Sequence, residues 1–279
     1  MSKSFAVLGS PISHSKSPII HQAAYRVLGE DWNYSSFDIQ KGGLKRFIDN
    51  DAVSHSGFSL TMPLKENAFH FANFADDLSH LTKASNTLVK KEDGWHAYNT
   101  DVFGIRQAIS LNLSTTIQQA LIIGSGATAT SALVAISILA PDSRVSVFAR
   151  NKKTRADLIE LGISLGLSMS KARFLTRAIK LADLTISTLP GGALDNAVSK
   201  LTKKKSLVPG GLLLDVAYHP WPSSLAALWI SRSKPVVSGL EMLLWQAVSQ
   251  IRIFKFGSPD QPLPNEIAVV EAMRVALEQ

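Results

Sequence analysis

The chain contains no cysteine among its 279 residues. Disulfides, thiolate-bound metals and cysteine nucleophiles are therefore excluded, while the redox state of its compartment stays open. The seven histidines show no metal-ligand spacing such as His-Glu-x-x-His, so the sequence predicts no metal site. We therefore expect the catalytic and ligand-binding groups of this chain among its hydroxyl, amide, lysine and aspartate side chains.

Long hydrophobic runs are absent as well. The longest candidate, residues 132–140, is far shorter than the roughly 20 apolar residues that span a bilayer, and it contains Ser137. The first residues pass directly into an apolar, strand-like run without the pattern of a signal peptide. We therefore expect a cytoplasmic protein with no membrane partner.

Acidic residues are the minority, since 22 Asp and Glu stand against 29 Lys and Arg and give a net charge of +7. The basic residues are scattered, and the densest run, Lys203–Lys205, has no interleaved aromatic residues. A nucleic-acid partner is therefore not expected. Small anionic molecules are better suited to this positive field.

The first hundred residues alternate between strand-like and helix-like segments, which predicts an α/β domain. Ser4–Gly9 is typical of a buried strand, and Ser17 followed by Pro18 predicts a helix start with Ser17 as the N-cap. Glu92-Asp93-Gly94 is a hairpin turn signal. The further predicted strands are 32–37, 58–61, 86–90 and 95–98, and the predicted helices are 19–28, 64–72 and 77–83.

From residue 118, strands alternate with helices, which is typical of a doubly wound, parallel, Rossmann-like sheet. Two final helices, 240–253 and one that ends at Leu277, are expected to return to the first domain. The sequence thus predicts a first domain of residues 1–103 that residues 239–279 complete, and a second domain of residues 104–238. The predicted strands of the second domain are 120–123, 145–148, 184–187, 212–215 and 236–237.

A glycine-rich turn follows the first strand of the second domain. Gly124 lets the chain turn sharply, and Gly126 lets the backbone approach a pyrophosphate that lies at a helix N-terminus. Ala129 occupies the third position of this fingerprint and is small enough for close packing of the helix on the sheet. In its strand–turn–helix context, the pattern predicts that the second domain binds a dinucleotide.

The end of the next strand distinguishes between the two nicotinamide dinucleotides. NAD-binding folds carry an acidic residue there for the ribose 2′-hydroxyl, but residues 149–155 contain none. Four cations lie there within six residues: Arg150, Lys152, Lys153 and Arg155. Because such a loop suits a 2′-phosphate, we expect NADP(H) as the cofactor.

Three segments of the first domain are polar where strand ends would expose them. They are residues 9–18, residues 59–65, and residues 85–87 together with 98–101. Their hydroxyl and amide groups, with one lysine and one aspartate, would make a suitable lining for a polyhydroxylated carboxylate. Each segment taken alone is equally consistent with helix caps and turns.

Together these motifs resemble the shikimate dehydrogenase family over essentially the whole chain. The family's serine pair matches Ser15 and Ser17, its Thr-x-Pro-x-Lys motif matches Thr61–Lys65, and its Asn-Thr-Asp motif matches Asn99–Asp101. Further substrate contacts of the family match Asn86, Tyr218 and Gln246. An ordered set of this kind is far more specific than any single motif.

The resemblance implies an oxidoreductase that uses NADPH to reduce 3-dehydroshikimate reversibly to shikimate, in chorismate and aromatic amino-acid biosynthesis. Lys65 would be the acid/base residue beside Asp101, in a substrate-binding first domain. Substrate binding would involve Ser15 and Ser17 at the carboxylate, Tyr218 near it, and Thr61, Asn86, Asp101 and Gln246 around the ring hydroxyls. Cofactor binding would involve Gly124, Ser125, Gly126, Ala127, Thr128, Arg150, Asn151, Arg155, Asp77 and Gly239.

The chain departs from the family's pattern in three places. Many members carry asparagine where this chain has Ser59, which shortens a polar arm near the substrate. An asparagine-arginine-threonine type of loop is altered here to Ala149–Asn151, with Arg155 one residue off register. Val102 replaces a usual glycine.

Two other functions stay open. An NAD-dependent quinate/shikimate dehydrogenase would carry an acidic residue at the end of the second cofactor strand, which this chain lacks. A ligand-responsive binding protein without turnover is disfavoured by the presence of both Lys65 and Asp101. The sequence does not decide between a monomer and a homodimer.

Overall fold

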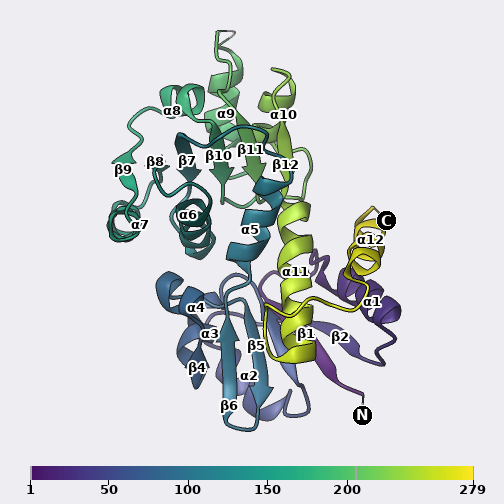
Figure 1. Ribbon diagram of the computed structural model, residues 1–279. Helices are drawn as coiled ribbons and strands as arrows, with labels where there is room; N and C mark the ends of the chain where they lie inside the picture. Colours follow the sequence, from purple (N-terminus) through teal and green to yellow (C-terminus); the bar gives the residue numbers. More distant parts are fainter. Residues whose placement is uncertain (1, 205, 279) are drawn as a thin grey trace. The chain divides into compact units, whose positions relative to one another are not determined.

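The computed structural model describes residues 2–204 and 206–278, so Lys205 of the basic run lies outside the described residues. The chain forms two compact units (Figure 1). The first comprises residues 1–104 and 243–279, and the second comprises residues 105–242. The chain therefore passes between the units within α5 (Asp101–Ser110) and near the start of α11 (Gly239–Phe256).

The first unit is built on a mixed sheet. Its strand order is β2-β1-β3-β5-β6-β4. The strands are β1 (Ser4–Gly9), β2 (Asn33–Asp38), β3 (Gly57–Leu60), β4 (Phe74–Ala75), β5 (Thr87–Lys91) and β6 (Gly94–Tyr98). The strand β1 runs parallel to its neighbours β2 and β3, whereas β5 is antiparallel to β3 and β6. The hairpin predicted from residues 92–94 is therefore confirmed.

Successive side chains of β1 point to opposite faces of this sheet. Apolar residues of β1 therefore contribute to a hydrophobic core on each face. Phe5 and Val7 pack in a cluster with α1 (Ser17–Leu28), α11 and α12 (Glu266–Leu277). The opposite face, with Ala6 and Leu8, packs against α2 (Leu44–Asn50) and α3 (Lys65–Phe71). The result is a three-layer α/β/α unit that the last two helices of the chain complete.

The start of α1 differs from the prediction. Ser17 is already the first helical residue, and Lys16 stands at the N-cap position without a capping side-chain bond. The Ser15 hydroxyl oxygen instead accepts a hydrogen bond from the Ser17 backbone N–H at 3.3 Å. Pro18 fits in the first turn because the N–H it lacks has no intrahelical partner there.

The second unit contains the predicted Rossmann-like sheet. Every pairing between its strands is parallel, in the order β12-β11-β10-β7-β8-β9. The strands are β7 (Gln119–Ile123), β8 (Arg144–Phe148), β9 (Ser168–Lys171), β10 (Leu184–Ser187), β11 (Leu212–Asp215) and β12 (Val236–Ser238). Counted from β7, this is the order typical of dinucleotide-binding folds, whose direction reverses between β7 and β10. The predicted α/β class is confirmed.

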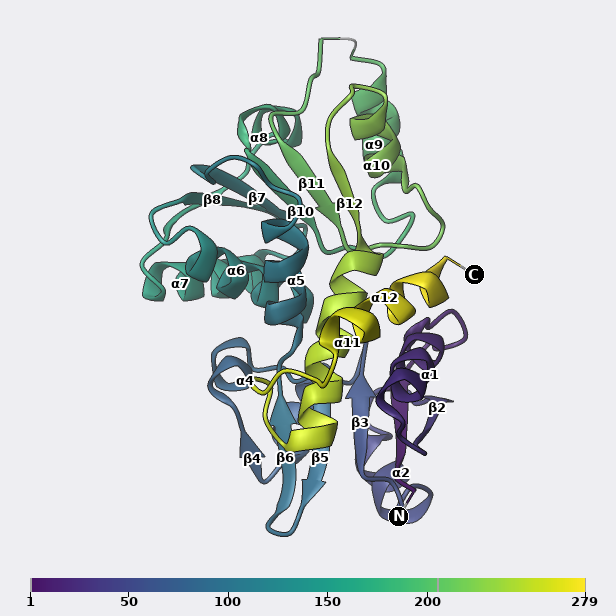
Figure 2. The ribbon, with the colours of Figure 1, turned by 45° about the vertical axis from the view of Figure 1, so that its right-hand side comes forward.

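Helices cover both faces of this sheet (Figures 1 and 2). On one face, α8 (Leu175–Leu181), α9 (Asp195–Thr202) and α10 (Ser224–Ile230) pack on Leu121 and Ile123 of β7. On the other side lie α6 (Ala127–Leu139) and α7 (Lys152–Ser164). The polar edge strand β9 and the short helices α8 to α10 were not predicted, because each is too short to show a clear period.

Candidate active site

Lys65 and Asp101, 36 residues apart in sequence, form a salt bridge in the first unit. The Lys65 ammonium nitrogen lies 2.5 Å from Asp101 Oδ2, and the two side chains are 14% and 4% exposed. Lys65 opens α3 after the loop that follows β3, and Asp101 opens α5 after Asn99 and Thr100, which link it to β6. The Asn99 side-chain oxygen accepts a bond from the Asp101 backbone N–H at 3.1 Å, which stabilises that helix start.

Asn86 joins this pair to α11. Its amide nitrogen donates to Asp101 Oδ1 at 2.8 Å and to Gln246 Oε1 at 3.1 Å. Its amide oxygen accepts from the Thr100 backbone N–H at 2.8 Å, which fixes which way the amide points. Asn86 is 2% exposed and Gln246 7%. Lys65, Asp101, Asn86 and Gln246 thus form one hydrogen-bonded cluster.

The segments that carry Ser15, Ser17 and Thr61 also belong to the first unit. Ser17 is buried and Ser15 is partly exposed. The loops after β1 and β3 touch, because Ser10 N–H donates to the Met62 carbonyl at 2.9 Å. A Cβ on Gly9 would lie only 2.3 Å from Thr61 Cγ2, so this approach requires a glycine.

In the second unit, the glycine turn joins β7 to α6. Gly124 has φ +122°, and a Cβ there would lie 2.2 Å from Thr188 Oγ1. Gly126 is the N-cap of α6. A Cβ on it would meet no heavy atom of the described residues within 4 Å, so open space lies beside the start of the helix. An uncapped helix N-terminus with free space beside it fits a pyrophosphate.

The loop after β8 is organised by side chains that bond to it. Asn151 is the N-cap of α7, where its side-chain oxygen accepts from the N–H groups of Lys153 and Thr154. The Arg155 guanidinium donates to the Ala149 carbonyl at 2.6 Å and so braces the loop, while Arg150 is exposed. Arg150 therefore suits a ligand phosphate better than Arg155 does.

Tyr218 and Gly239 also lie in the second unit. Tyr218 follows β11 in a loop that Asp215 anchors, because Asp215 accepts from Ser223 Oγ at 2.5 Å and from the Ala217 N–H at 3.3 Å. Burial raises the pKa of the Asp215 carboxyl, and these two bonds oppose that rise. Gly239 is required by close packing, since a Cβ there would lie 2.1 Å from the Val216 carbonyl oxygen.

Asp77 belongs to the first unit, at the start of α4 (Asp77–Thr82), whereas the other predicted cofactor residues belong to the second unit. It is exposed and follows Asp76, whose side chain caps this helix by accepting from the Ser79 N–H. An acidic residue in a first turn is favoured by the helix dipole. Stabilisation of α4 thus explains the acidic side chain of Asp77, and it does so equally well as contact with a ligand.

Four residues around the cluster were not predicted as site residues. Asn99 and Thr100 hold Asp101 and Asn86 in place, and they stand inside the quoted Asn-Thr-Asp motif. Gln250 donates to the Asn86 backbone carbonyl at 3.0 Å, and Ser59 donates to Gln250. Gln250 follows Gln246 by four residues, so helical spacing alone indicated that both lie on one face of α11.

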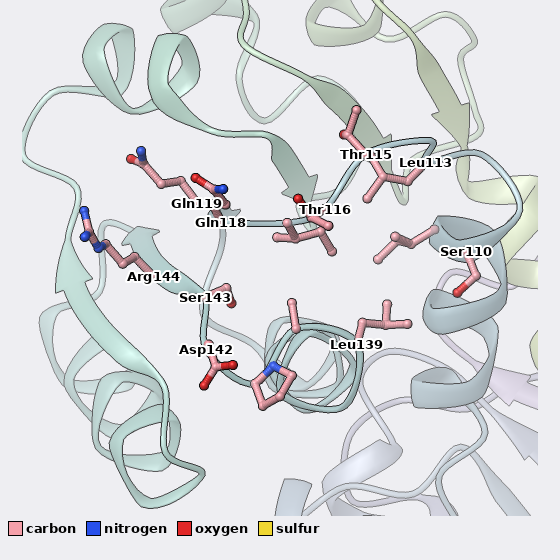
Figure 3. Close-up of a pocket in the computed structure, with 14 residues that line it drawn as sticks. Ser110, Leu113, Thr115, Thr116, Gln118, Gln119, Leu139, Asp142, Ser143 and Arg144 are labelled. Atoms are coloured by element: carbon pink, nitrogen blue, oxygen red, sulfur yellow. The ribbon is translucent and has the colours of Figure 1, made fainter.

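A hollow of about 620 Å³ lies elsewhere in the second unit (Figure 3). Its lining includes Thr116, Leu139 and Ser143, near the beginnings of β7 and β8. It contains none of the predicted site residues. Ligands of open parallel sheets bind beyond the carboxyl ends of the strands, so this hollow lies at the wrong end for a cofactor.

Across residues 2–204 and 206–278, no helix is long and apolar enough to cross a membrane. The same residues include no group of three or more His, Asp or Glu side chains placed to hold a metal ion.

Comparison with known proteins agrees with the motifs. Residues 7–88 match the model of the shikimate dehydrogenase substrate binding domain. The shikimate dehydrogenase (NADP(+)) of Methanothermobacter thermautotrophicus is 30% identical over 258 residues, 91% of each chain.

Solved structures extend the likeness to the whole chain. The Mycobacterium tuberculosis shikimate dehydrogenase has a TM-score of 0.85 and 36% identity over 99% of both chains. The Thermus thermophilus enzyme in complex with shikimate has a TM-score of 0.78 and 26% identity, over 99% of this chain and 100% of that one. Since both the sequence and the fold agree over nearly the full length, the chain belongs to the shikimate dehydrogenase family.

Proposed function

We propose that the chain is an NADP-dependent shikimate dehydrogenase that interconverts 3-dehydroshikimate and shikimate. The observation that carries the proposal is the buried cluster in which Lys65, Asp101, Asn86 and Gln246 are hydrogen-bonded together. The family relatives named above support both the substrate and the cofactor, since one is named for NADP(+) and another binds shikimate.

The substrate occupies the first unit in this proposal. Ser15 and Ser17 bind its carboxylate beside the N-terminus of α1, whose partial positive charge favours an anion. Asn86, Gln246 and Thr61 bind the ring hydroxyls. Tyr218 of the second unit contributes near the carboxylate. Binding by several fixed polar groups orients the ring, so its carbonyl is presented to Lys65.

Lys65 acts as the acid in reduction and as the base in oxidation. The chemistry supplied by bound NADPH is a hydride for the carbonyl carbon. Negative charge then grows on the carbonyl oxygen, and Lys65 Nζ donates a proton to it. Asp101 keeps Lys65 in place through the 2.5 Å salt bridge and contacts a ring hydroxyl. Lys65 recovers its proton through the Asp101 carboxylate and solvent.

The second unit binds the cofactor. Gly124–Thr128 would hold the pyrophosphate at the start of α6, and Gly239 would line the nicotinamide. Arg150 and the loop around Asn151 would bind the 2′-phosphate, with Arg155 as the brace of that loop. The lack of an acidic residue in residues 149–155 supports NADP over NAD, and so disfavours the NAD-dependent quinate/shikimate alternative.

A binding protein without turnover is disfavoured by the intact Lys65–Asp101 salt bridge. We infer a cytoplasmic enzyme whose partners are these small molecules. Whether it acts as a monomer or as a homodimer stays a prediction.

Turnover by Lys65→Met tests the mechanism. NADP⁺ reduction by shikimate, followed at 340 nm, should show kcat lowered by about 10²–10⁴-fold while the shikimate KM changes little, because general acid/base catalysis contributes that much. Lys90→Met, which removes an exposed lysine from β5, is the matched control and should keep wild-type kcat.

The same assay, repeated with NAD⁺ and with quinate, tests the specificity. The wild type should prefer NADP⁺ to NAD⁺ by at least about tenfold in kcat/KM, as one or two charge-assisted bonds provide.

A folded Lys65→Met enzyme that retains a third of the wild-type kcat would remove Lys65 from the mechanism. A wild type that does not oxidise shikimate with NADP⁺ would contradict the function itself.

A further inference from the structure

Ser59, where many family members carry asparagine, is enclosed rather than aimed at a ligand. It is 4% exposed and lies on β3. Its hydroxyl oxygen accepts from the Tyr34 hydroxyl at 2.6 Å, and its hydrogen is donated to Gln250 Oε1 at 2.8 Å. The single hydrogen of Ser59 is therefore already in use.

The direction of these bonds follows from Gln250. Its amide nitrogen donates to the Asn86 backbone carbonyl at 3.0 Å and to Thr87 Oγ1 at 3.1 Å. Because a carbonyl only accepts, the amide oxygen of Gln250 faces the other way and needs donors there. Ser59 must therefore donate to Gln250, and Tyr34 must donate to Ser59.

Tyr34, on β2, is the first donor in this series of bonds, because its hydroxyl donates to Ser59. Tyr34, Ser59 and Gln250 are each less than 5% exposed. These three residues, the buried relay, connect β2 to the backbone carbonyl of Asn86 through hydrogen bonds of fixed direction.

A side branch of the relay runs away from the cluster. His21 Nε2 lies 3.3 Å from Gln250 Oε1, and His21 Nδ1 lies 3.1 Å from the Tyr25 hydroxyl. The His21 ring stacks on Tyr34 with centroids 4.0 Å apart. The Tyr25 hydroxyl thus bonds the ring nitrogen of His21 that does not face Gln250.

We propose that Tyr34, Ser59 and Gln250 are positioning residues, which hold Asn86 in place at the ring hydroxyls of the substrate. The proposal rests on the proposed function.

Tyr34→Phe tests the relay, because it removes one hydroxyl and keeps the ring that stacks on His21. With shikimate and NADP⁺, we expect the shikimate KM to rise about tenfold, equivalent to about 1.4 kcal/mol. The kcat should stay within about threefold and the NADP⁺ KM should not change, since neither Lys65 nor the second unit is touched. Ser59→Ala should give the same split between KM and kcat. The double variant should be no worse than either single variant, because both break one series of bonds.

Tyr25→Phe is the matched control. It removes a hydroxyl from an equally buried tyrosine, so it should lower the melting temperature by a similar amount and leave the shikimate KM unchanged. If Tyr34→Phe lowers the melting temperature without changing the KM, or if Tyr25→Phe raises the KM as much, the relay has no positioning role. Failure of the wild type to oxidise shikimate would instead contradict the proposed function.

Discussion

At the scale of single residues, His21 shows how strongly burial acts on a titratable group. The side chain is wholly enclosed, and burial lowers its pKa to about 3 against the opposing effect of the bond to Gln250. The facing hydroxyls of Tyr25 and Tyr34 stay neutral, because burial raises the pKa of both. His21 is therefore uncharged in the folded protein at any ordinary pH.

Acid should destabilise the protein through this residue. Between about pH 6.5 and pH 3 the unfolded chain binds a proton at His21 and the folded chain does not, so the free energy of unfolding falls as the pH falls. The slope is about 1.4 kcal/mol per pH unit once the pH is well below 6.5, which amounts to about 2 kcal/mol at pH 5.

Urea unfolding of the wild type and of His21→Phe, each at pH 7.5 and pH 5, measures this effect. Phenylalanine keeps an aromatic ring and cannot be protonated, so its loss of stability between the two pH values should be smaller by about 2 kcal/mol. Equal losses in the two proteins would show that His21 does not contribute.

At the scale of elements, the turn between β7 and α6 assigns different tasks to its two glycines. Gly124 is needed for the fold, because its φ is +122° and a Cβ would meet Thr188 Oγ1 at 2.2 Å. Gly126 has an extended backbone and open space around its Cβ position. The space beside Gly126 is what the proposed pyrophosphate would use.

Alanine substitutions should separate these two tasks. Gly126→Ala should keep or raise the free energy of unfolding by up to about 1 kcal/mol, since alanine adopts this conformation without strain. It should raise the NADP⁺ KM at least about tenfold, because the methyl group stands where the pyrophosphate approaches.

Gly124→Ala should instead lower the free energy of unfolding by about 1–3 kcal/mol, the usual cost of a strained backbone conformation. Thermal unfolding and NADP⁺ titration of both variants provide the measurement. A Gly126→Ala protein with wild-type NADP⁺ affinity would place the pyrophosphate elsewhere.

At the scale of the whole molecule, both ends of the chain build the first unit. Helix α12, at the C-terminus, packs on α1 and contributes Val269 and Met273 to the core. Arg252 of α11 forms a salt bridge with Glu266 at the start of α12, which ties these two helices together. The bond to Arg252 lowers the pKa of the Glu266 carboxyl against the effect of its burial.

The stability of the N-terminal unit should therefore depend on the last residues of the chain. Met273 is fully buried, so Met273→Ala should cost about 2–5 kcal/mol. Ile267→Ala on the same helix, where the side chain is 86% exposed, should change stability by no more than about 0.5 kcal/mol. Thermal denaturation of the two variants compares them, and equal melting temperatures would show that α12 is not part of this core.

The sequence by itself determined the elements that local patterns specify. The strand–glycine–helix pattern from β7 to α6 and the hairpin at residues 92–94 could be predicted, because each depends on neighbouring residues and on backbone conformations that glycine favours. The class of the second sheet followed from the alternation of strands and helices. The motif residues themselves, such as Lys65 and Asp101, were available through the family resemblance, and their catalytic roles stay predictions.

Only the tertiary structure decided which distant residues meet. The beginning of α1 was misplaced by one residue, because the oxygen that bonds the Ser17 N–H comes from Ser15. The bonds of Ser59 join it to Tyr34, 25 residues away, and to Gln250, 191 residues away. No local pattern encodes such bonds, because a buried hydroxyl takes whichever partner the packing of the strands and helices brings to it.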